Sequence, residues 1–124
     1  MSKIDDLYET IGGNQTVRAA IDSFYRKVLA DEELRPFFAG TDMAHLRAGQ
    51  SMFISMVLGG QKVYTGRDIG NAHAQARLQG LNATHFELFL HHFRAALNEV
   101  GVNAEKAEKA IKLLEGQRGP VLNP

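Results

Sequence analysis

A helical repeat containing a single histidine runs through Asp68-Ile69-Gly70-Asn71-Ala72-His73-Ala74-Gln75-Ala76-Arg77. At 3.6 residues per turn, one side of the predicted helix carries the residues at i, i+3, i+4 and i+7, which are Ile69, Ala72, His73 and Ala76. His73 is the polar member of this apolar stripe. Burying its imidazole costs free energy unless a ring nitrogen gains a partner, either a hydrogen-bonding group or a metal ion. For this helix alone, a core histidine that is hydrogen-bonded within the protein is the simpler interpretation.

The composition predicts one domain spanning residues 1–124. The 124 residues are 44% hydrophobic and 23% charged, which is ordinary for a globular chain with one core. Fourteen basic and fourteen acidic residues give a formal net charge of zero, so neither nucleic acid nor a membrane is expected as a partner. The absence of cysteine excludes disulfides, thiolate metal sites and cysteine nucleophiles. Because the sequence shows no apolar leader and no membrane-length segment, we expect a cytoplasmic monomer.

The 3.6-residue repeat recurs along the chain and strand patterns are scarce, so we expect an all-α fold. Predicted helices cover about residues 4–11, 14–35, 42–58, 68–80, 84–100 and 103–115, with an irregular loop over 59–67 and a frayed tail over 116–124. The pair Gly12-Gly13 is suited to a sharp reversal after the first helix. The expected N-terminal caps are Asn14, Thr41 or Asp42, Thr84 with Glu87 in a capping box, and Asn103.

Three polar residues interrupt the apolar stripes of three different predicted helices. Tyr25, Gln50 and His73 each occupy a position where a leucine would fit, four residues from an apolar member of the same stripe. A buried tyrosine is common, but a buried glutamine brings two donors and an acceptor into the core. Three such residues on three helices predict a shared site with apolar walls and a few convergent polar groups, which is the usual composition of a ligand site.

Several occupants of this site are compatible with the residues. The three side chains could bond one another without a ligand, whereas a catalytic triad or a carboxylate pair finds no suitable residues on the stripes. Zinc would need three or four ligands, and the remaining histidines are predicted to lie at the surface: His45, His85, His91 and His92. Haem needs only one imidazole, because the porphyrin supplies four nitrogens. The apolar residues available to line a haem cleft are Phe38, Met43, Leu46, Tyr64, Ile69, Leu78, Phe86 and Val102.

The chain resembles a group I truncated haemoglobin over nearly its whole length. The matching motifs are Leu7-Tyr8-Glu9, Ile11-Gly12-Gly13, Phe24-Tyr25, Val28-Leu29-Ala30-Asp31, Phe37-Phe38, Thr41-Asp42-Met43, Gln50, Gly59-Gly60, Tyr64-Thr65-Gly66, Ala72-His73, Gly80-Leu81 and His85-Phe86. The glycine pairs and the spacing from Phe24-Tyr25 to Ala72-His73 are specific in combination. The resemblance implies a truncated globin, an all-α sandwich of helices packed two over two around a haem.

The resemblance also implies a role for individual residues. His73 would be the proximal ligand to the iron of a b-type haem, and Tyr25 and Gln50 would be the distal donors that act on the bound ligand. Ile54 and Val57 would lie near an apolar access route. The implied haem contacts are Phe38, Thr41, Met43, Leu46, Gln50, Tyr64, Ile69, His73, Leu78, Phe86 and Val102.

Three departures from the family pattern bear on the haem. Gly49 stands where some members carry a distal histidine that closes the sixth coordination position of the iron. No histidine follows His92, so the covalent haem link of some members is not expected. Leu46 replaces a glutamine that several relatives have at this position. The resemblance therefore implies an open sixth position and a non-covalent haem.

The implied function is reversible binding of O₂, NO and CO at a five-coordinate ferrous haem. The oxy form would support conversion of NO to nitrate, with an unidentified reductase as partner. Two alternatives stay open: oxygen storage or sensing without turnover, and a haem-free helical interaction module, which explains none of the three polar residues. The phenolate of Tyr25 is expected to form near the ordinary pKa of about 10.

Overall fold

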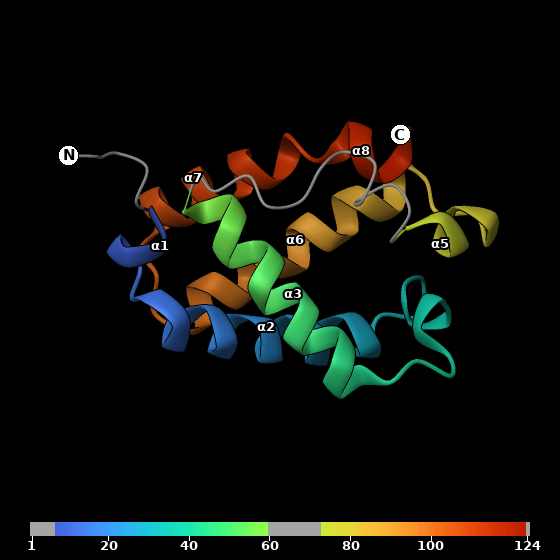
Figure 1. Ribbon diagram of the computed structural model, residues 1–124, viewed down its shortest axis with the longest axis horizontal. Helices are drawn as coiled ribbons and strands as arrows, with labels where there is room; N and C mark the ends of the chain where they lie inside the picture. The colour runs from blue at the N-terminus through green and yellow to red at the C-terminus, as the bar shows by residue number, and fades with distance from the viewer. Residues whose placement is uncertain (1–6, 60–72, 124) are drawn as a thin grey trace.

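The computed structural model describes residues 7–59 and 73–123, and in these parts it consists of helices and short connections (Figure 1). The helices are α1 (Leu7–Thr10), α2 (Gly13–Ala30), the 3₁₀ helix η1 (Arg35–Phe38), α3 (Met43–Leu58), α5 (Ala74–Leu78), α6 (Ala83–Glu99), α7 (Ala104–Glu115) and α8 (Arg118–Leu122). The predicted all-α class is confirmed. The predicted helical residues 4–6 and 68–72, and the predicted loop beyond Gly59, lie outside the described parts.

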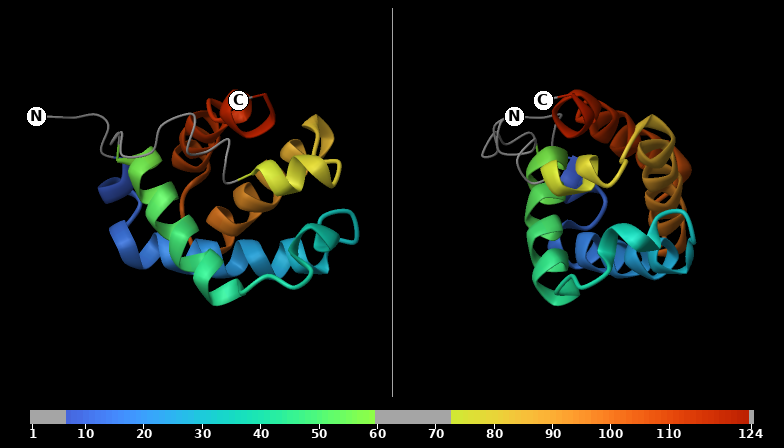
Figure 2. Two further views of the ribbon diagram at one scale, coloured as in Figure 1. Left: turned by 45° about the vertical axis from the view of Figure 1, so that its right-hand side comes forward. Right: turned by 90° about the vertical axis from the view of Figure 1, so that its right-hand side faces the viewer.

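Four long helices build the part of the molecule that the structure describes. α2 packs against both α3 and α6, and α6 packs in turn against α7. In the end-on view of Figure 2, these four helices surround a common interior. None of the helices in the described ranges combines the length and the apolar character needed to cross a membrane.

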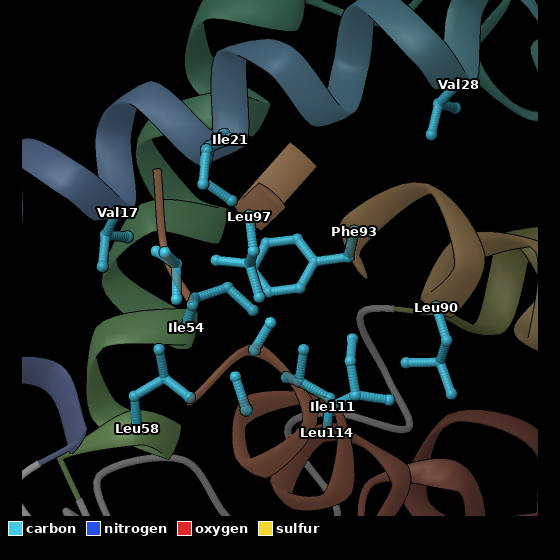
Figure 3. Packing of buried hydrophobic residues seen from close by; sticks show 14 of the residues in the cluster. Val17, Ile21, Val28, Ile54, Leu58, Leu90, Phe93, Leu97, Ile111 and Leu114 are labelled. Carbon is cyan, nitrogen blue, oxygen red and sulfur yellow. The ribbon is translucent and has the colours of Figure 1, made fainter. Parts of the chain in front are cut away.

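The interior is filled by the apolar stripes of these four helices (Figure 3). Val17 and Ile21 of α2 are 1% and 2% exposed, and Leu97 of α6 meets them from the other side at 1% exposure. Truncating one such leucine to alanine typically costs about 2–5 kcal/mol of stability. The predicted apolar face of α7 is confirmed, since all its members are buried: Ala107, Ala110, Ile111 and Leu114.

A polar cluster on Glu99 fastens the end of α6 to α2. The hydroxyl of the fully buried Ser23 donates to Glu99 Oε1 at 2.9 Å, and Lys27 and Arg26 of α2 form ion pairs with the same carboxylate. The bonds from Lys27, Ser23 and Arg26 lower the pKa of Glu99 to about 2. The cluster joins residues that lie more than seventy positions apart in the sequence.

The start of α2 depends on a pair of glycines rather than on Asn14. Gly12 and Gly13 have φ angles of 122° and 68°, both in the region that L side chains rarely adopt. A Cβ on Gly12 would also lie 2.1 Å from the hydroxyl oxygen of Thr16. No side chain caps the helix at its Gly12 N-cap position, so the predicted Asn14 cap is wrong. The sharp reversal predicted at Gly12-Gly13 is confirmed.

The other caps follow the prediction in two cases out of three. Asp42 caps α3 by accepting from the backbone N–H of His45 at 3.2 Å, and Asn103 caps α7 as predicted. The predicted Thr84 capping box is wrong. Instead, Asn82 Oδ1 accepts from the N–H of His85 at 3.3 Å, and His85 Nδ1 accepts from the N–H of Asn82 at 3.1 Å. A histidine therefore takes the place usually held by glutamate or glutamine in this motif.

The C-terminal segment is helical, so the predicted frayed tail is wrong over Arg118–Leu122. Val121 is 7% exposed and belongs to the core cluster. Its carbonyl accepts a hydrogen bond from Arg77 Nη1 at 2.9 Å. A single buried valine without a neighbouring apolar repeat is too weak a pattern to predict a helix, which explains the error.

Candidate functional site

Tyr25 and Gln50, from two different helices, meet at the α2–α3 interface. Tyr25 is 2% exposed, which confirms its predicted burial. The side chain of Gln50 lies close enough to the Tyr25 hydroxyl for hydrogen bonding between the two groups to lower the pKa of that phenol. Gln50 itself is half-buried, so its predicted place in the core is only partly correct. Two of the three polar residues that interrupt the helix stripes thus form one unit.

Aromatic rings surround Tyr25 and hold its orientation. The Phe24 ring lies 4.9 Å from it at 71°, and the Phe38 ring of η1 lies 5.8 Å from it at 81°. Phe38 extends the cluster to Phe89 of α6, with ring centroids 6.1 Å apart. Edge-to-face contacts of this kind add about 0.5–1.5 kcal/mol per pair to the burial of the rings. The hydroxyl of Tyr25 is therefore the polar end of an otherwise apolar wall.

The environment of Tyr25 keeps its hydroxyl protonated. Burial raises the pKa of Tyr25 well above its ordinary value of 10, while the nearby Arg47 guanidinium and the Gln50 hydrogen bond partly oppose that rise. The expected ordinary pKa of this phenol is therefore wrong, because that expectation took the reference value and left out the effect of burial on the charged form. A protonated phenol has one O–H to donate, and its oxygen can also accept a hydrogen bond.

Arg47 is a site neighbour that the sequence pattern did not reveal. Its Nε is buried and finds no hydrogen-bond acceptor among the described residues, and it lies 3.7 Å from Asp22 Oδ1 in an ion pair. Arg47 directly follows the stripe position of Leu46, and a charged residue there is ordinarily interpreted as solvent-facing. Only the crossing of α2 and α3 places its charge beside Tyr25.

His73 directly precedes α5 and is half-buried. Its carbonyl accepts from the N–H of Arg77 at 3.0 Å, so His73 belongs to the first turn of this short helix. In every view of Figures 1 and 2, α5 lies at the same end of the molecule as η1, the start of α6 and α8. That end also carries Phe38, the ring that contacts Tyr25.

The other predicted haem contacts divide into two groups. Phe38, Met43 and Leu46 are half-buried apolar residues on η1 and the first turn of α3, and Phe86 is 7% exposed near the start of α6. These four lie on the elements that carry the polar pair or at the α5 end of the molecule.

The second group consists of the remaining predicted haem contacts, which do not lie together with these four residues in the described parts of the chain. Thr41 is exposed in the connection before α3, and Leu78 of α5 is 82% exposed. Val102 is 8% exposed in the turn between α6 and α7, at the opposite end of α6 from α5 (Figure 1). Tyr64 and Ile69 lie outside the described residues.

The histidines predicted to be at the surface differ from one another. His45 and His91 are exposed as predicted. His92 is only 17% exposed, and its Nε2 lies 2.7 Å from Asp31 Oδ2, so the surface prediction is wrong for this residue. His85 is half-buried, caps α6 and places its ring 4.9 Å from that of Phe37. In residues 7–59 and 73–123, no three metal-ligating side chains of His, Asp or Glu converge on one point.

Gly49 precedes Gln50 on an open part of α3. It is exposed, and a Cβ built on it would meet no atom within 4 Å. The backbone there is not in the positive-φ region. The small residue at this position therefore reflects neither crowding nor backbone strain.

The chain is similar to known haem proteins along most of its length. Residues 6–123 match the bacterial-like globin family. A group 1 truncated haemoglobin of Tetrahymena pyriformis is 38% identical over 122 residues, which are 98% of this chain and 98% of that protein. A crystal structure of truncated haemoglobin from the same organism, in the Fe(III) form, matches with a TM-score of 0.83 at 36% identity, covering 95% of this chain and 98% of that one.

A solved structure from a second organism is also similar to this chain. The 2/2 haemoglobin of Synechococcus sp., solved in the cyanomet state with covalently attached haem, gives a TM-score of 0.86 at 33% identity. The match covers 96% of this chain and 99% of that one. These likenesses confirm the predicted two-over-two helical fold.

Proposed function

Because the chain belongs to the bacterial-like globins and, within them, to the group 1 truncated haemoglobins, we propose that it binds haem b without a covalent link and uses it to bind O₂ reversibly. The observation that carries this proposal is the pairing of Tyr25 with Gln50 beside the Phe38 ring. Two hydrogen-bond donors set against an aromatic wall fit a small polar ligand held at an apolar macrocycle.

The donor set of the chain fits haem. His73 offers one imidazole from a short helix, and haem needs no more, because the macrocycle supplies four nitrogens of its own. The partly exposed Phe38, Leu46 and Met43 offer apolar surface for the macrocycle on the elements next to Tyr25. In this assignment His73 is the proximal ligand, and Phe86 and Leu78 belong to the proximal side.

Haem, when bound, would supply a ferrous iron able to bind O₂, CO and NO and to give up one electron in the conversion of NO and O₂ to nitrate. An external reductase would then have to reduce the ferric iron. Tyr25 and Gln50 act on the ligand. The Tyr25 hydroxyl would donate to the ligand, and the amide of Gln50, its hydrogen-bonding partner, would offer a second donor. A hydrogen bond to a partly charged oxygen contributes about 1.5–3 kcal/mol.

Neither Leu46 nor Gly49 would compete with the ligand for the iron of a bound haem. Leu46, one turn before Gln50, carries no group that ligates iron, and Gly49 carries no side chain at all. We therefore expect the ferrous protein without ligand to be five-coordinate. A visible spectrum with sharp, split low-spin bands in that state contradicts this expectation.

An absorption spectrum tests the haem assignment. The purified full-length protein, reconstituted with haemin, is expected to show a Soret band, and His73→Ala is expected to lose most of its haem. His45→Ala is the matched control, since His45 is exposed on α3. Unchanged haem content and an unchanged Soret band in His73→Ala overturn the assignment of the iron ligand. A wild-type protein that binds no haem overturns the proposed function.

A second experiment separates binding from turnover. The oxy form is mixed with NO in a stopped-flow instrument, and rapid, stoichiometric formation of the ferric protein and nitrate is expected. Association of a small ligand with an open site approaches the diffusion limit of about 10⁹ M⁻¹s⁻¹. Conversion that is orders of magnitude slower leaves storage or sensing of O₂ as the function.

A further inference from the structure

α5, the helix that follows His73, is too short to fix its own position. It has five residues, whereas isolated helices below about 12–15 residues are marginal in water. Its position therefore depends on contacts with the rest of the chain. Because the N–H of Arg77 bonds to the His73 carbonyl at 3.0 Å, a shift or rotation of α5 carries His73 with it.

The side chain of Arg77 fastens α5 to the C-terminal helix. Its Nη1 donates to the Val121 carbonyl at 2.9 Å, across 44 residues of sequence, in a part-buried position. Val121 is packed in the core, so the acceptor sits on a fixed part of α8. Figure 1 shows α5 and α8 toward the same end of the molecule.

α8 is held in turn by Arg118. Its Nε donates to Glu115 at the end of α7 at 2.9 Å, and its Nη2 also forms an ion pair with Glu87 of α6. The guanidinium carbon lies 4.8 Å from the centroid of the Phe86 ring. A planar guanidinium that pairs with carboxylates and stacks on a ring is well suited to lock one helix against two others.

We propose that Arg77 is a positioning residue for His73, and that α8 supports the proximal side of the haem site through it. The inference rests on the proposed function, in which His73 ligates the iron. α6 and α7 hold α8 through Arg118, α8 holds α5 through Arg77, and α5 sets the direction of the His73 imidazole. The last turn of the chain thereby controls the iron–histidine bond and the retention of haem.

Four variants of the full-length, haem-loaded protein test this. Arg77→Met removes the donor but keeps the length of the side chain, and Arg77→Lys keeps a donor. Arg118→Met loosens α8 from a different side. Arg94→Met is the matched control, because Arg94 forms its ion pair with Glu108 elsewhere on α6 and α7. The readouts are the iron–histidine stretching band of the ferrous protein, the rate of haem transfer to a scavenging apoglobin, and thermal unfolding of the haem-free protein.

Arg77→Met is expected to shift or broaden the iron–histidine band and to speed haem release about tenfold, the effect of losing one hydrogen bond from a charged donor. Arg77→Lys should restore most of both signals, and Arg94→Met should change neither. Arg118→Met should act in the same direction, and its effect should not add fully to that of Arg77→Met, because the two residues act through one link.

A wild-type band position and release rate in Arg77→Met overturn the inference and leave the proposed function intact. The same holds if Arg94→Met reproduces the effect, or if the changes follow only the loss of stability in the haem-free protein. A wild-type protein without a Soret band overturns the proposed function, and this inference falls with it.

Discussion

The Tyr25 hydroxyl on α2 and the side chain of Gln50 on α3 are hydrogen-bonding partners, so the two residues of the candidate distal pair meet across the α2–α3 interface. The two side chains differ in burial. Tyr25 is enclosed, whereas Gln50 is only half-buried at the edge of the core. Tyr25 therefore supplies the enclosed polar group of the pair, and Gln50 supplies the more accessible one.

Removal of the Tyr25 hydroxyl should accelerate the release of O₂. Tyr25→Phe loses a bond to a partly charged oxygen worth about 1.5–3 kcal/mol, which is roughly a tenfold to hundredfold faster dissociation. Gln50→Leu should lose less, because the tyrosine remains, and the double variant should deviate from additivity. Stopped-flow displacement of O₂ by CO measures the rates. Tyr8→Phe on α1 serves as control, and additive effects of the two distal changes contradict the coupling.

Tyr25 should resist ionisation in the folded protein. Burial raises its pKa above the value of 10 that it has in the unfolded chain, so the unfolded chain loses its phenol proton first and stability falls as the pH rises above about 10. Subtracting the phenolate absorbance of Tyr25→Phe from that of the wild type should leave no titration between about pH 9 and pH 11. Arg47→Gln should raise the pKa of Tyr25 further. A full tyrosine titration in that window shows that the phenol is accessible.

The Asp31–His92 pair should make the fold sensitive to acid. The hydrogen bond from His92 lowers the pKa of Asp31 below its ordinary value, so the stability it contributes is present above the unfolded pKa of about 3.9 and is lost as the pH falls through the lower folded value. At neutral pH, Asp31→Asn should lower stability by about 1.5 kcal/mol. This corresponds to a melting temperature about 5 °C lower.

The pH dependence of that difference is the decisive measurement. Melting curves followed by circular dichroism at pH 7 and near pH 2.5 should show the gap between wild type and Asp31→Asn closing in acid. Since other carboxylates titrate in both proteins, only the difference reports on Asp31. A gap that is as wide in acid as at pH 7 assigns the effect of the substitution to lost packing.

Two glycines should respond to alanine in opposite ways. Gly49 lies inside α3 with helical backbone and open space around it, so Gly49→Ala should add about 0.5–1 kcal/mol of stability. Gly12 has a φ of 122°, and an added Cβ would collide with Thr16. Gly12→Ala should therefore cost more than about 1 kcal/mol. Urea unfolding of both variants checks the signs, and stabilisation by both would contradict the backbone assignment at Gly12.

The helices, their stripes and the place of Tyr25 were predictable from the sequence because they depend on local periodicity. The buried face of α7 and the Asn103 cap follow from patterns that span about one to three helical turns. The likeness of sequence motifs also led to the correct family, since several weak signals keep their spacing along the chain.

Several of the errors share a physical origin in contacts between distant parts of the sequence. His92 meets Asp31 across 61 residues, and Arg77 meets Val121 across 44, so neither partner is visible from its own helix. Periodicity predicts which face of a helix is buried, but it does not predict against which residue.

The Ser23–Glu99 bond has a consequence for how the chain folds during its synthesis. It joins α2, near the beginning, to the end of α6, 76 residues later. The apolar stripe of α2 packs mainly on α6 and α3, so much of it stays in water until the second half of the chain leaves the ribosome. A domain cannot finish folding until the last segment that forms its long-range contacts has been synthesised. The nascent N-terminal half, with the Tyr25 wall still uncovered, is therefore the stage at which this protein is most exposed to aggregation and to chaperones.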